Sequence, residues 1–171
     1  MSKKTSIFFV ILFSISLTIF AQQKPKSADD ILKSALSQAN YYNKNVLVIF
    51  HATWCGWCKR LIKVVNGSEV SNIFNNNFVV TYIDVRERGE MIKLVENPGG
   101  QELMSRLGGG SSGVPFYVFL DSKGNVITSN AGYPSRRSVP SFVARIKKSA
   151  KNIDNGSLNK ITEFMNKVTS D

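Results

Sequence analysis

A strand pattern, a helix pattern and a second strand pattern, in that order, constrain the fold of this 171-residue chain most strongly. Residues 46–50 (Val-Leu-Val-Ile-Phe) are an unbroken apolar run, and residues 78–85 are a second strand pattern. Such runs are typical of strands that are buried on both faces. Between them, residues 55–65 have helical spacing, with Leu61, Ile62 and Val65 on one side. This order predicts a parallel βαβ unit.

The flanking segments predict the rest of an α/β domain. Ser27, followed by Asp30, predicts the start of a helix whose apolar residues recur as far as Ala39. Two later strand patterns flank the turn at Gly124 and predict a hairpin. Further helices are expected at residues 68–75, 101–107, 138–148 and 158–168, a strand or helical turn at 91–95, and no regular structure in the glycine-rich segment 108–113. We therefore expect a central mixed sheet, a parallel βαβ half plus an antiparallel hairpin, flanked by helices.

The N-terminal 21 residues differ from the rest of the chain. Lys3 and Lys4 precede an uncharged apolar run at residues 7–21. A bilayer span needs about 20 apolar residues, so this run fits the core of a secretory signal better. We expect cleavage near Ala21, a linker at residues 22–27, one domain at 28–171, and a periplasmic or secreted product. The alternative is a chain anchored to the membrane by residues 7–21.

The positive charge of the chain is dispersed. The net charge is +10, and subtracting the charges of Lys3 and Lys4 leaves +8. No aromatic-rich basic ribbon accompanies the lysines and arginines, which excludes the usual pattern of a nucleic-acid-binding chain. We expect a solvated surface, no nucleic-acid partner and a monomer.

The two cysteines lie in one tetrapeptide, Cys55-Gly56-Trp57-Cys58. A disulfide across two residues constrains the unfolded chain very little, so a structural staple explains the pair poorly. Haem attachment needs a histidine where Lys59 stands, and a zinc site needs four ligands, whereas the chain has two cysteines and His51. A redox pair needs one thiol at a helix N-terminus and the second at i+3. The spacing fits a redox pair, and a copper-binding or copper-delivery module remains the alternative.

The residues around this pair resemble the thioredoxin family. The strand at 46–50, followed by His51-Ala52-Thr53-Trp54-Cys55-Gly56-Trp57-Cys58-Lys59, resembles the family's first active-site segment. Gly113-Val114-Pro115 before a strand pattern resembles its cis-proline loop. The resemblance extends over residues 28–150. The chain looks more like exported thioredoxin-like proteins, including the thioredoxin domain of the membrane thiol:disulfide interchange reductase, than like the general cytosolic reductant.

The resemblance implies a thioredoxin-like fold and a protein-disulfide oxidoreductase without cofactor or metal. Cys55 would attack a substrate disulfide and Cys58 would resolve the mixed disulfide. Contacts with the substrate would come from five residues: Trp54, Gly56, Trp57, Val114 and Pro115. The partners implied are protein thiols and disulfides and a membrane reductase that donates electrons. Reduction is the expected direction, while oxidation and isomerisation remain open.

Four features depart from thioredoxins proper, and one is Gly56-Trp57 where the family has Gly-Pro between the cysteines. Ile49 stands where the family has a buried aspartate, and Lys63 stands where it commonly has a helix proline. An insert is expected at residues 96–112. His51, four residues before Cys55, is either a thiolate-stabilising residue or an ordinary packed histidine.

Overall fold

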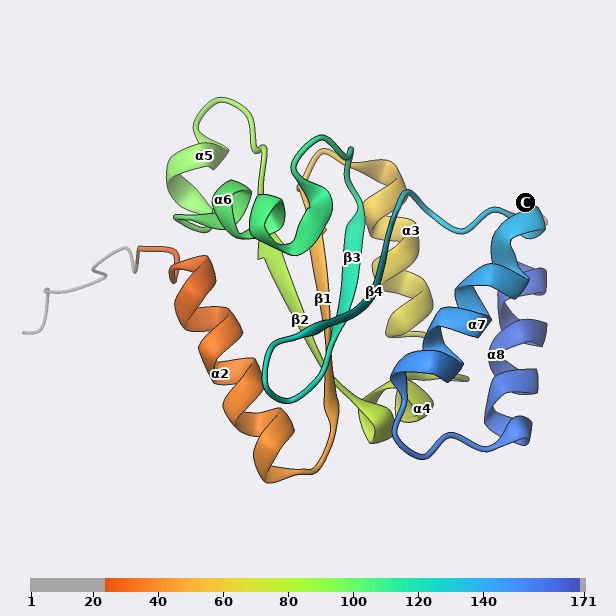
Figure 1. Ribbon diagram of the computed structural model, residues 1–171. Coiled ribbons are helices and arrows are strands. Elements are labelled where there is room, and N and C mark those ends of the chain that lie inside the picture. The colour runs from red at the N-terminus through yellow and green to blue at the C-terminus, as the bar shows by residue number, and fades with distance from the viewer. Residues whose placement is uncertain (1–23, 170–171) are drawn as a thin grey trace, which may run out of the picture.

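The computed structural model describes residues 24–169, so the signal peptide expected at residues 1–21 lies outside the described residues. The chain forms these elements in order: α2 (Ala28–Tyr41), β1 (Asn45–His51), α3 (Gly56–Val65), α4 (Ser71–Asn77), β2 (Phe78–Asp84), α5 (Met91–Leu94), α6 (Gly100–Met104), η1 (Ser105–Gly109), β3 (Phe116–Leu120), β4 (Val126–Ala131), η2 (Arg136–Ser138), α7 (Val139–Ser149) and α8 (Asn155–Val168). Figure 1 shows their arrangement.

A four-stranded mixed sheet with the order β2-β1-β3-β4 forms the centre of the domain. β1 pairs with β2 in parallel, as the βαβ pattern predicts. β1 and β3 are antiparallel, and so are β3 and β4. Because β1 and β3 run in opposite directions, the carboxyl end of β1 lies beside the amino end of β3, where Phe50 pairs with Phe116. The expected mixed sheet is confirmed.

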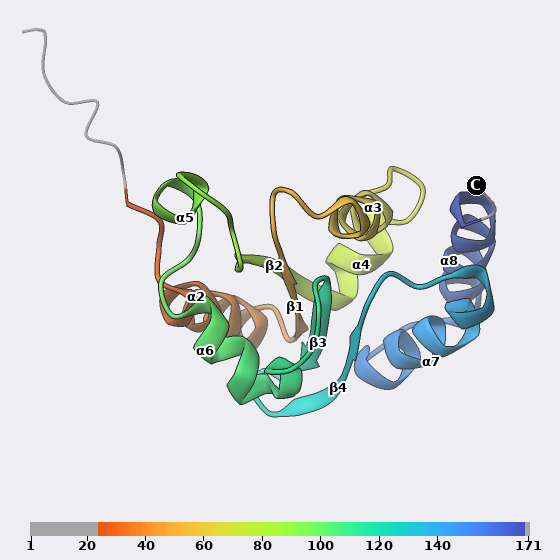
Figure 2. The same ribbon diagram turned by 90° about the horizontal axis from the view of Figure 1, so that it is seen from above.

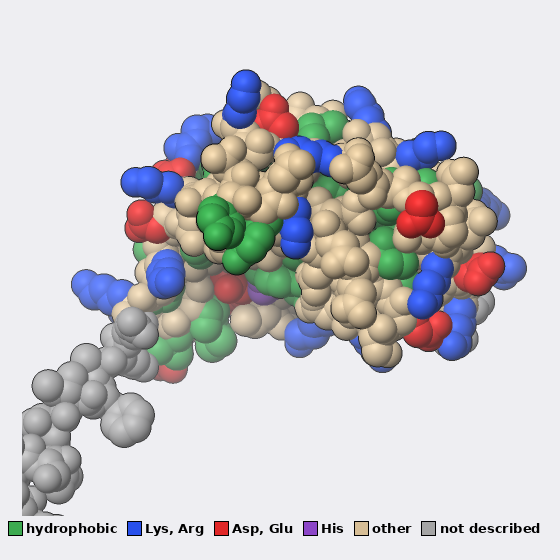
Figure 3. All heavy atoms as spheres, turned by 90° about the horizontal axis from the view of Figure 1, so that it is seen from below, with side chains coloured by type: hydrophobic (Ala, Val, Ile, Leu, Met, Phe, Trp, Pro, Cys, Tyr) green, Lys and Arg blue, Asp and Glu red, His purple; other side chains and the backbone are tan. Residues whose placement is uncertain are grey.

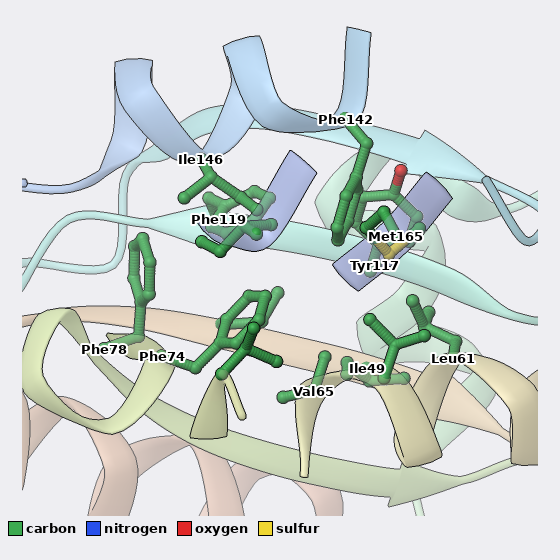
Figure 4. Close-up of a cluster of buried hydrophobic side chains, with 14 of the residues drawn as sticks. Ile49, Leu61, Val65, Phe74, Phe78, Tyr117, Phe119, Phe142, Ile146 and Met165 are labelled. Carbon is green, nitrogen blue, oxygen red and sulfur yellow. The ribbon is translucent and has the colours of Figure 1, made fainter. Parts of the chain in front are cut away.

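Helices cover both faces of the sheet (Figure 2). Alternate residues of β1 point to opposite faces, so Val48 and Phe50 pack with α2 and α6, whereas Leu47 and Ile49 pack with α3, α4, α7 and α8. On the face covered by α3, α4, α7 and α8, the space between sheet and helices is filled by Phe74, Tyr117, Phe119 and Phe142 (Figure 4).

The helix start expected at Ser27 is confirmed, whereas α8 starts earlier than expected. The Ser27 hydroxyl accepts a hydrogen bond from the Asp30 N–H at 3.1 Å and caps α2. The Asp154 carboxylate accepts from the Ser157 N–H at 2.8 Å and caps α8, which starts three residues before the helix expected at 158–168. α8 packs against α7 and extends the helical layer on that face.

The glycine-rich segment differs in part from the expectation. Residues 108–109 belong to η1, whereas residues 110–113 form neither helix nor strand, as expected. Of the two alternatives for residues 91–95, the structure has the helical turn. Gly108 has a φ of +91°, a conformation that side chains rarely adopt. A Cβ on Gly109 would lie 2.6 Å from Cδ1 of Phe116, so this glycine allows the turn to pack closely on β3. Composition alone predicted flexibility where the glycines instead serve a turn and a close contact.

Charged groups are spread over the surface of the domain. On the face seen in Figure 3, lysine and arginine side chains lie scattered among acidic ones, which agrees with a solvated surface. Within residues 24–169, no helix has the length and apolar character needed to cross a bilayer.

Candidate active site

The two cysteines lie where β1 turns into α3. Cys55 is the N-cap of α3, and Cys58 follows in the first turn of the helix. The two residues form a disulfide with a Cα–Cα distance of 5.2 Å. The expected placement, one sulfur at the helix N-terminus and the other one turn later, is therefore present.

Cys55 is the more accessible of the pair, although both are largely buried. Cys55 is 4% exposed and Cys58 is fully buried, with Ala52 and Val114 packed around them. The backbone N–H of Cys58 points at the Sγ atom of Cys55 at 3.1 Å. In the reduced protein, this N–H and the helix N-terminus would stabilise a thiolate on Cys55.

The loop before β3 closes the other side of the site. The Val114–Pro115 peptide bond is cis, as the resemblance implies. The carbonyl oxygen of Val114 lies 3.6 Å from the Sγ atom of Cys55. Because a disulfide sulfur carries no proton, this distance is a contact in the oxidised protein. The pairing of β1 with β3 brings this loop to Cys55, 59 residues away in the sequence.

Trp54 is exposed beside the disulfide and is held by the loop after β2. Its indole N–H donates to the carbonyl oxygen of Arg86 at 2.8 Å, and the Arg88 guanidinium lies 3.8 Å from the ring centroid. The side chain is nevertheless 43% exposed. The indole therefore contacts the domain on one side and leaves part of its ring accessible to solvent.

Trp57 lies on the opposite flank and is 56% exposed. Its ring stacks on Tyr133 with a centroid distance of 5.7 Å, and the Arg60 guanidinium lies 4.9 Å above it. Between the two cysteines, Gly56 has open space where a side chain would project. The five residues expected to contact substrate therefore lie around the disulfide, and their binding role stays a prediction.

Glu87 is a structural neighbour of the site that the sequence did not indicate. Its carboxylate accepts a hydrogen bond from the Thr53 N–H and another from the Thr53 hydroxyl, both at 2.6 Å. Glu87 is only 6% exposed, and its own N–H donates to Glu96 at 2.6 Å. The carboxylate therefore fixes the turn two residues before Cys55. No local signal connects these residues, because 34 positions separate them.

The His51 side chain is partly buried and faces the carboxylate of Asp84. Its Nδ1 atom lies 3.4 Å from Oδ1 of Asp84, at the ends of the paired strands β1 and β2. Burial raises the pKa of Asp84, the charge of His51 lowers it, and the carboxylates of Glu87 and Glu96 raise it further. This arrangement gives His51 a structural partner on the β2 side of the sheet.

Ile49 and Lys63, at positions where thioredoxins proper have other residues, lie in the core of the domain and on α3. Ile49 is fully buried in the core cluster that includes Leu61 and Val64 of α3. Lys63 lies in the last turn of α3, where a positive charge complements the helix dipole. Across residues 24–169, no three histidine, cysteine or acidic side chains are grouped to hold a metal ion.

Comparison with known proteins agrees with this geometry. A sequence model of the family described as thioredoxin-like matches residues 28–122, more than half of the chain. A disulphide isomerase from Xylella fastidiosa Temecula1 has a TM-score of 0.53 and 22% identity, with 90% of this chain and 99% of that chain covered.

Two thioredoxins are similar in fold at the same level of identity. A mutant thioredoxin from Halobacterium salinarum NRC-1 has a TM-score of 0.50 and 23% identity, covering 80% of this chain and 99% of its own. A thioredoxin from Thermus thermophilus has a TM-score of 0.50 and 23% identity, covering 74% and 88%. At this identity the likeness shows the fold. No curated protein matches the sequence.

Proposed function

The chain belongs to the thioredoxin-like family, and on that premise we propose that it is an exported oxidoreductase that reduces protein disulfides through Cys55 and Cys58. The observation that carries this proposal is the disulfide at the N-terminus of α3, in contact with the cis Val114–Pro115 loop. A bond that closes so short a loop contributes little to stability, so its use is chemical.

The reaction begins from the reduced pair. The Cys55 thiolate attacks one sulfur of a substrate disulfide, and the other substrate sulfur leaves as a thiolate. Cys58, after losing its proton to solvent, attacks Sγ of Cys55, which releases the second substrate thiolate and forms the Cys55–Cys58 disulfide. Two electrons pass from the protein to the substrate, which takes up two protons. A partner dithiol must then reduce the Cys55–Cys58 disulfide and become a disulfide itself.

The residues around the sulfurs support this sequence of steps. The Cys58 N–H, 3.1 Å from Sγ of Cys55, favours the attacking thiolate. The greater exposure of Cys55 favours it as the residue that meets the substrate. Its contact with Val114 brings the backbone of that loop within reach of an extended substrate segment.

Export is the second part of the proposal and rests on the sequence. The basic start and the apolar run at residues 7–21 support transport into the periplasm or secretion. Reduction in such an oxidising compartment requires electrons from elsewhere, which supports a membrane reductase as partner. Fractionation of cells expressing the full chain, with N-terminal sequencing of the product, tests this part. A cytoplasmic product that keeps residues 1–21 would contradict it.

Reductase activity is tested with purified protein that lacks residues 1–21. We expect the wild type to reduce insulin in the presence of a dithiol, and the Cys55→Ser variant to lose this activity. The Cys58→Ser variant should form a mixed disulfide with substrate that mass spectrometry detects, because it can attack but not resolve. Equal activity of the wild type and the Cys55→Ser variant would sink the proposal.

A further inference from the structure

A groove begins at the active site and runs away from it between α3 and the segment after β4. Its first part, of 470 Å³, is lined by Val114 and Pro115 at one end and by Trp57, Tyr133 and Arg136 along it. Arg60 and Tyr133 also line a second hollow of about 490 Å³, between α3 and α8, so the two hollows adjoin at these side chains. We call this surface the basic groove.

Cations dominate the basic groove. Arg60 and Arg136 line the first part, and Lys63 and Lys167 line the second. The described residues that line either part include no aspartate or glutamate. Lys167 pairs with Glu69 at 3.3 Å, whereas Arg60 and Arg136 form no ion pair with any described residue. Among the described residues, the guanidinium groups of Arg60 and Arg136 therefore have no anionic partner in the groove.

The guanidinium of Arg60 lies against an aromatic ring. Its guanidinium lies 4.9 Å from the centroid of Trp57, which in turn stacks on Tyr133. A guanidinium held on a ring keeps its N–H donors free for a carboxylate while losing less side-chain entropy on binding. The charge of Arg60 also lowers the pKa of the Tyr133 hydroxyl, against the larger effect of burial, which raises it.

The groove is also aligned with the substrate path. Val114 contacts Sγ of Cys55 and at the same time lines the groove. A polypeptide whose cysteine is bonded to Cys55, and whose backbone continues from Val114 into the groove, would pass Trp57, Arg60 and Arg136, which line it. The aromatic rings would contact any peptide, so the guanidinium groups are what could discriminate between peptides.

We propose that the basic groove selects substrate polypeptides that carry acidic side chains beside the reacting cysteine. This inference rests on the proposed oxidoreductase function and adds a substrate class to it. Exposed ion pairs are individually weak, so we expect Arg60 and Arg136 together to give about a five-fold preference at low ionic strength. The preference should fall as salt screens the charges.

The test uses single turnover of the pre-reduced protein with short peptides. Each peptide has one cysteine linked to 2-thiopyridine, a neutral leaving group, and differs only in the neighbouring residues, which are glutamate, glutamine, leucine or lysine. Cys55 attacks the peptide sulfur, the coloured thiopyridine leaves with the electron pair, and Cys58 then releases the peptide thiol. The readout is the ratio of second-order rate constants between peptides, which cancels any change in the reactivity of Cys55.

The variants distinguish the effect of the arginines that line the groove from the effect of a nearby positive charge outside it. We expect the glutamate-to-glutamine ratio to be about five in the wild type and below two in the Arg60→Gln/Arg136→Gln variant. Arg137→Gln is the control, because Arg137 is an exposed neighbour of Arg136 that does not line the groove. It should keep more than half of the preference of the wild type.

Three results would overturn the inference while leaving the oxidoreductase function intact. The first is equal rates for all peptides, and the second is a faster reaction of the leucine peptide than of the glutamate peptide. The third is a glutamate-to-glutamine ratio that falls as far in the Arg137→Gln control as in the Arg60→Gln/Arg136→Gln variant. Failure of every peptide to react would instead contradict the proposed function, and the groove proposal with it.

Discussion

Glu87 should hold the active-site turn in place, and replacing it tests how the turn is built. Its two carboxylate oxygens accept hydrogen bonds from the N–H and the hydroxyl of Thr53, each at 2.6 Å. The perturbation is Glu87→Ala, which leaves both donors of Thr53 without their partner. Because Thr53 is only partly exposed, water can replace these bonds incompletely.

The size of the effect follows from these contacts. Hydrogen bonds to a charged group contribute about 1.5–3 kcal/mol each. The variant also no longer buries a carboxylate that is 6% exposed in the wild type, which offsets part of the loss. We expect the free energy of unfolding to fall by about 2–4 kcal/mol. With a urea m-value of about 2 kcal/mol per M, the midpoint should fall by about 1–2 M.

The assay combines urea unfolding, followed by tryptophan fluorescence, with the rate of insulin reduction. Glu90→Ala is the matched control, because Glu90 lies exposed on the same loop. It should change stability by less than about 0.5 kcal/mol. At zero urea, where the variant is still folded, we expect Glu87→Ala to lower kcat/KM by about ten-fold, because Cys55 loses its fixed position.

A double-mutant cycle with Thr53→Val isolates the hydroxyl–carboxylate bond. The coupling energy should be about 1 kcal/mol or more. A cost for Glu87→Ala no larger than that of Glu90→Ala would refute the reasoning, since the carboxylate would then not hold the turn. If Glu87→Ala lowers the free energy of unfolding as expected but leaves kcat/KM unchanged, the turn does not control the reactivity of Cys55.

Two further predictions concern the core behind the site. Phe142, buried against the ring of Tyr117 at a centroid distance of 5.6 Å, should cost about 3–5 kcal/mol in unfolding free energy when changed to alanine. Urea unfolding measures this, and the exposed Lys147→Ala on the same helix should have almost no effect. Burial raises the pKa of Tyr117 from 10.0 to about 12, so its contribution to stability is present below pH 10 and is lost as pH rises towards 12. Between about pH 8 and pH 11, the free energy of unfolding of the Tyr117→Phe variant, measured in urea, should fall by about 1 kcal/mol less than that of the wild type. An equal fall in both proteins would contradict burial as the cause of the raised pKa.

The sequence predicted the elements whose signals are local. The unbroken run at 46–50 indicated a strand buried on both faces, and the structure has β1 in the middle of the sheet. Ser27 indicated the start of α2 because a cap acts on the residues next to it in the chain. The spacing of Cys55 and Cys58 indicated a helix start for the same reason.

The sequence did not predict contacts that only the tertiary fold creates. Glu87 reaches Thr53 because β1 and β2 are parallel neighbours, so the loops after both strands meet at one edge of the sheet. Tyr133 follows β4 and stacks on Trp57 of α3, a contact between segments far apart in the sequence. Arg60 was within reach of sequence reasoning, since residues three apart on a helix share a face, and Trp57 and Arg60 are so placed.

The replacement of the family's buried aspartate by Ile49 has a structural consequence that connects the core to the site. Ile49 is fully buried between the sheet and α3, so an ionised group there would lose its hydration without gaining a partner. The carboxylates near the active-site turn lie instead on the β2 side, where Glu87 is bound to Thr53 and Asp84 faces His51. Acidic side chains of this protein therefore shape the turn before Cys55, while the surroundings of Cys58 are apolar. Under the proposed mechanism, the fully buried Cys58 therefore loses its proton without the carboxylate that the family places at position 49.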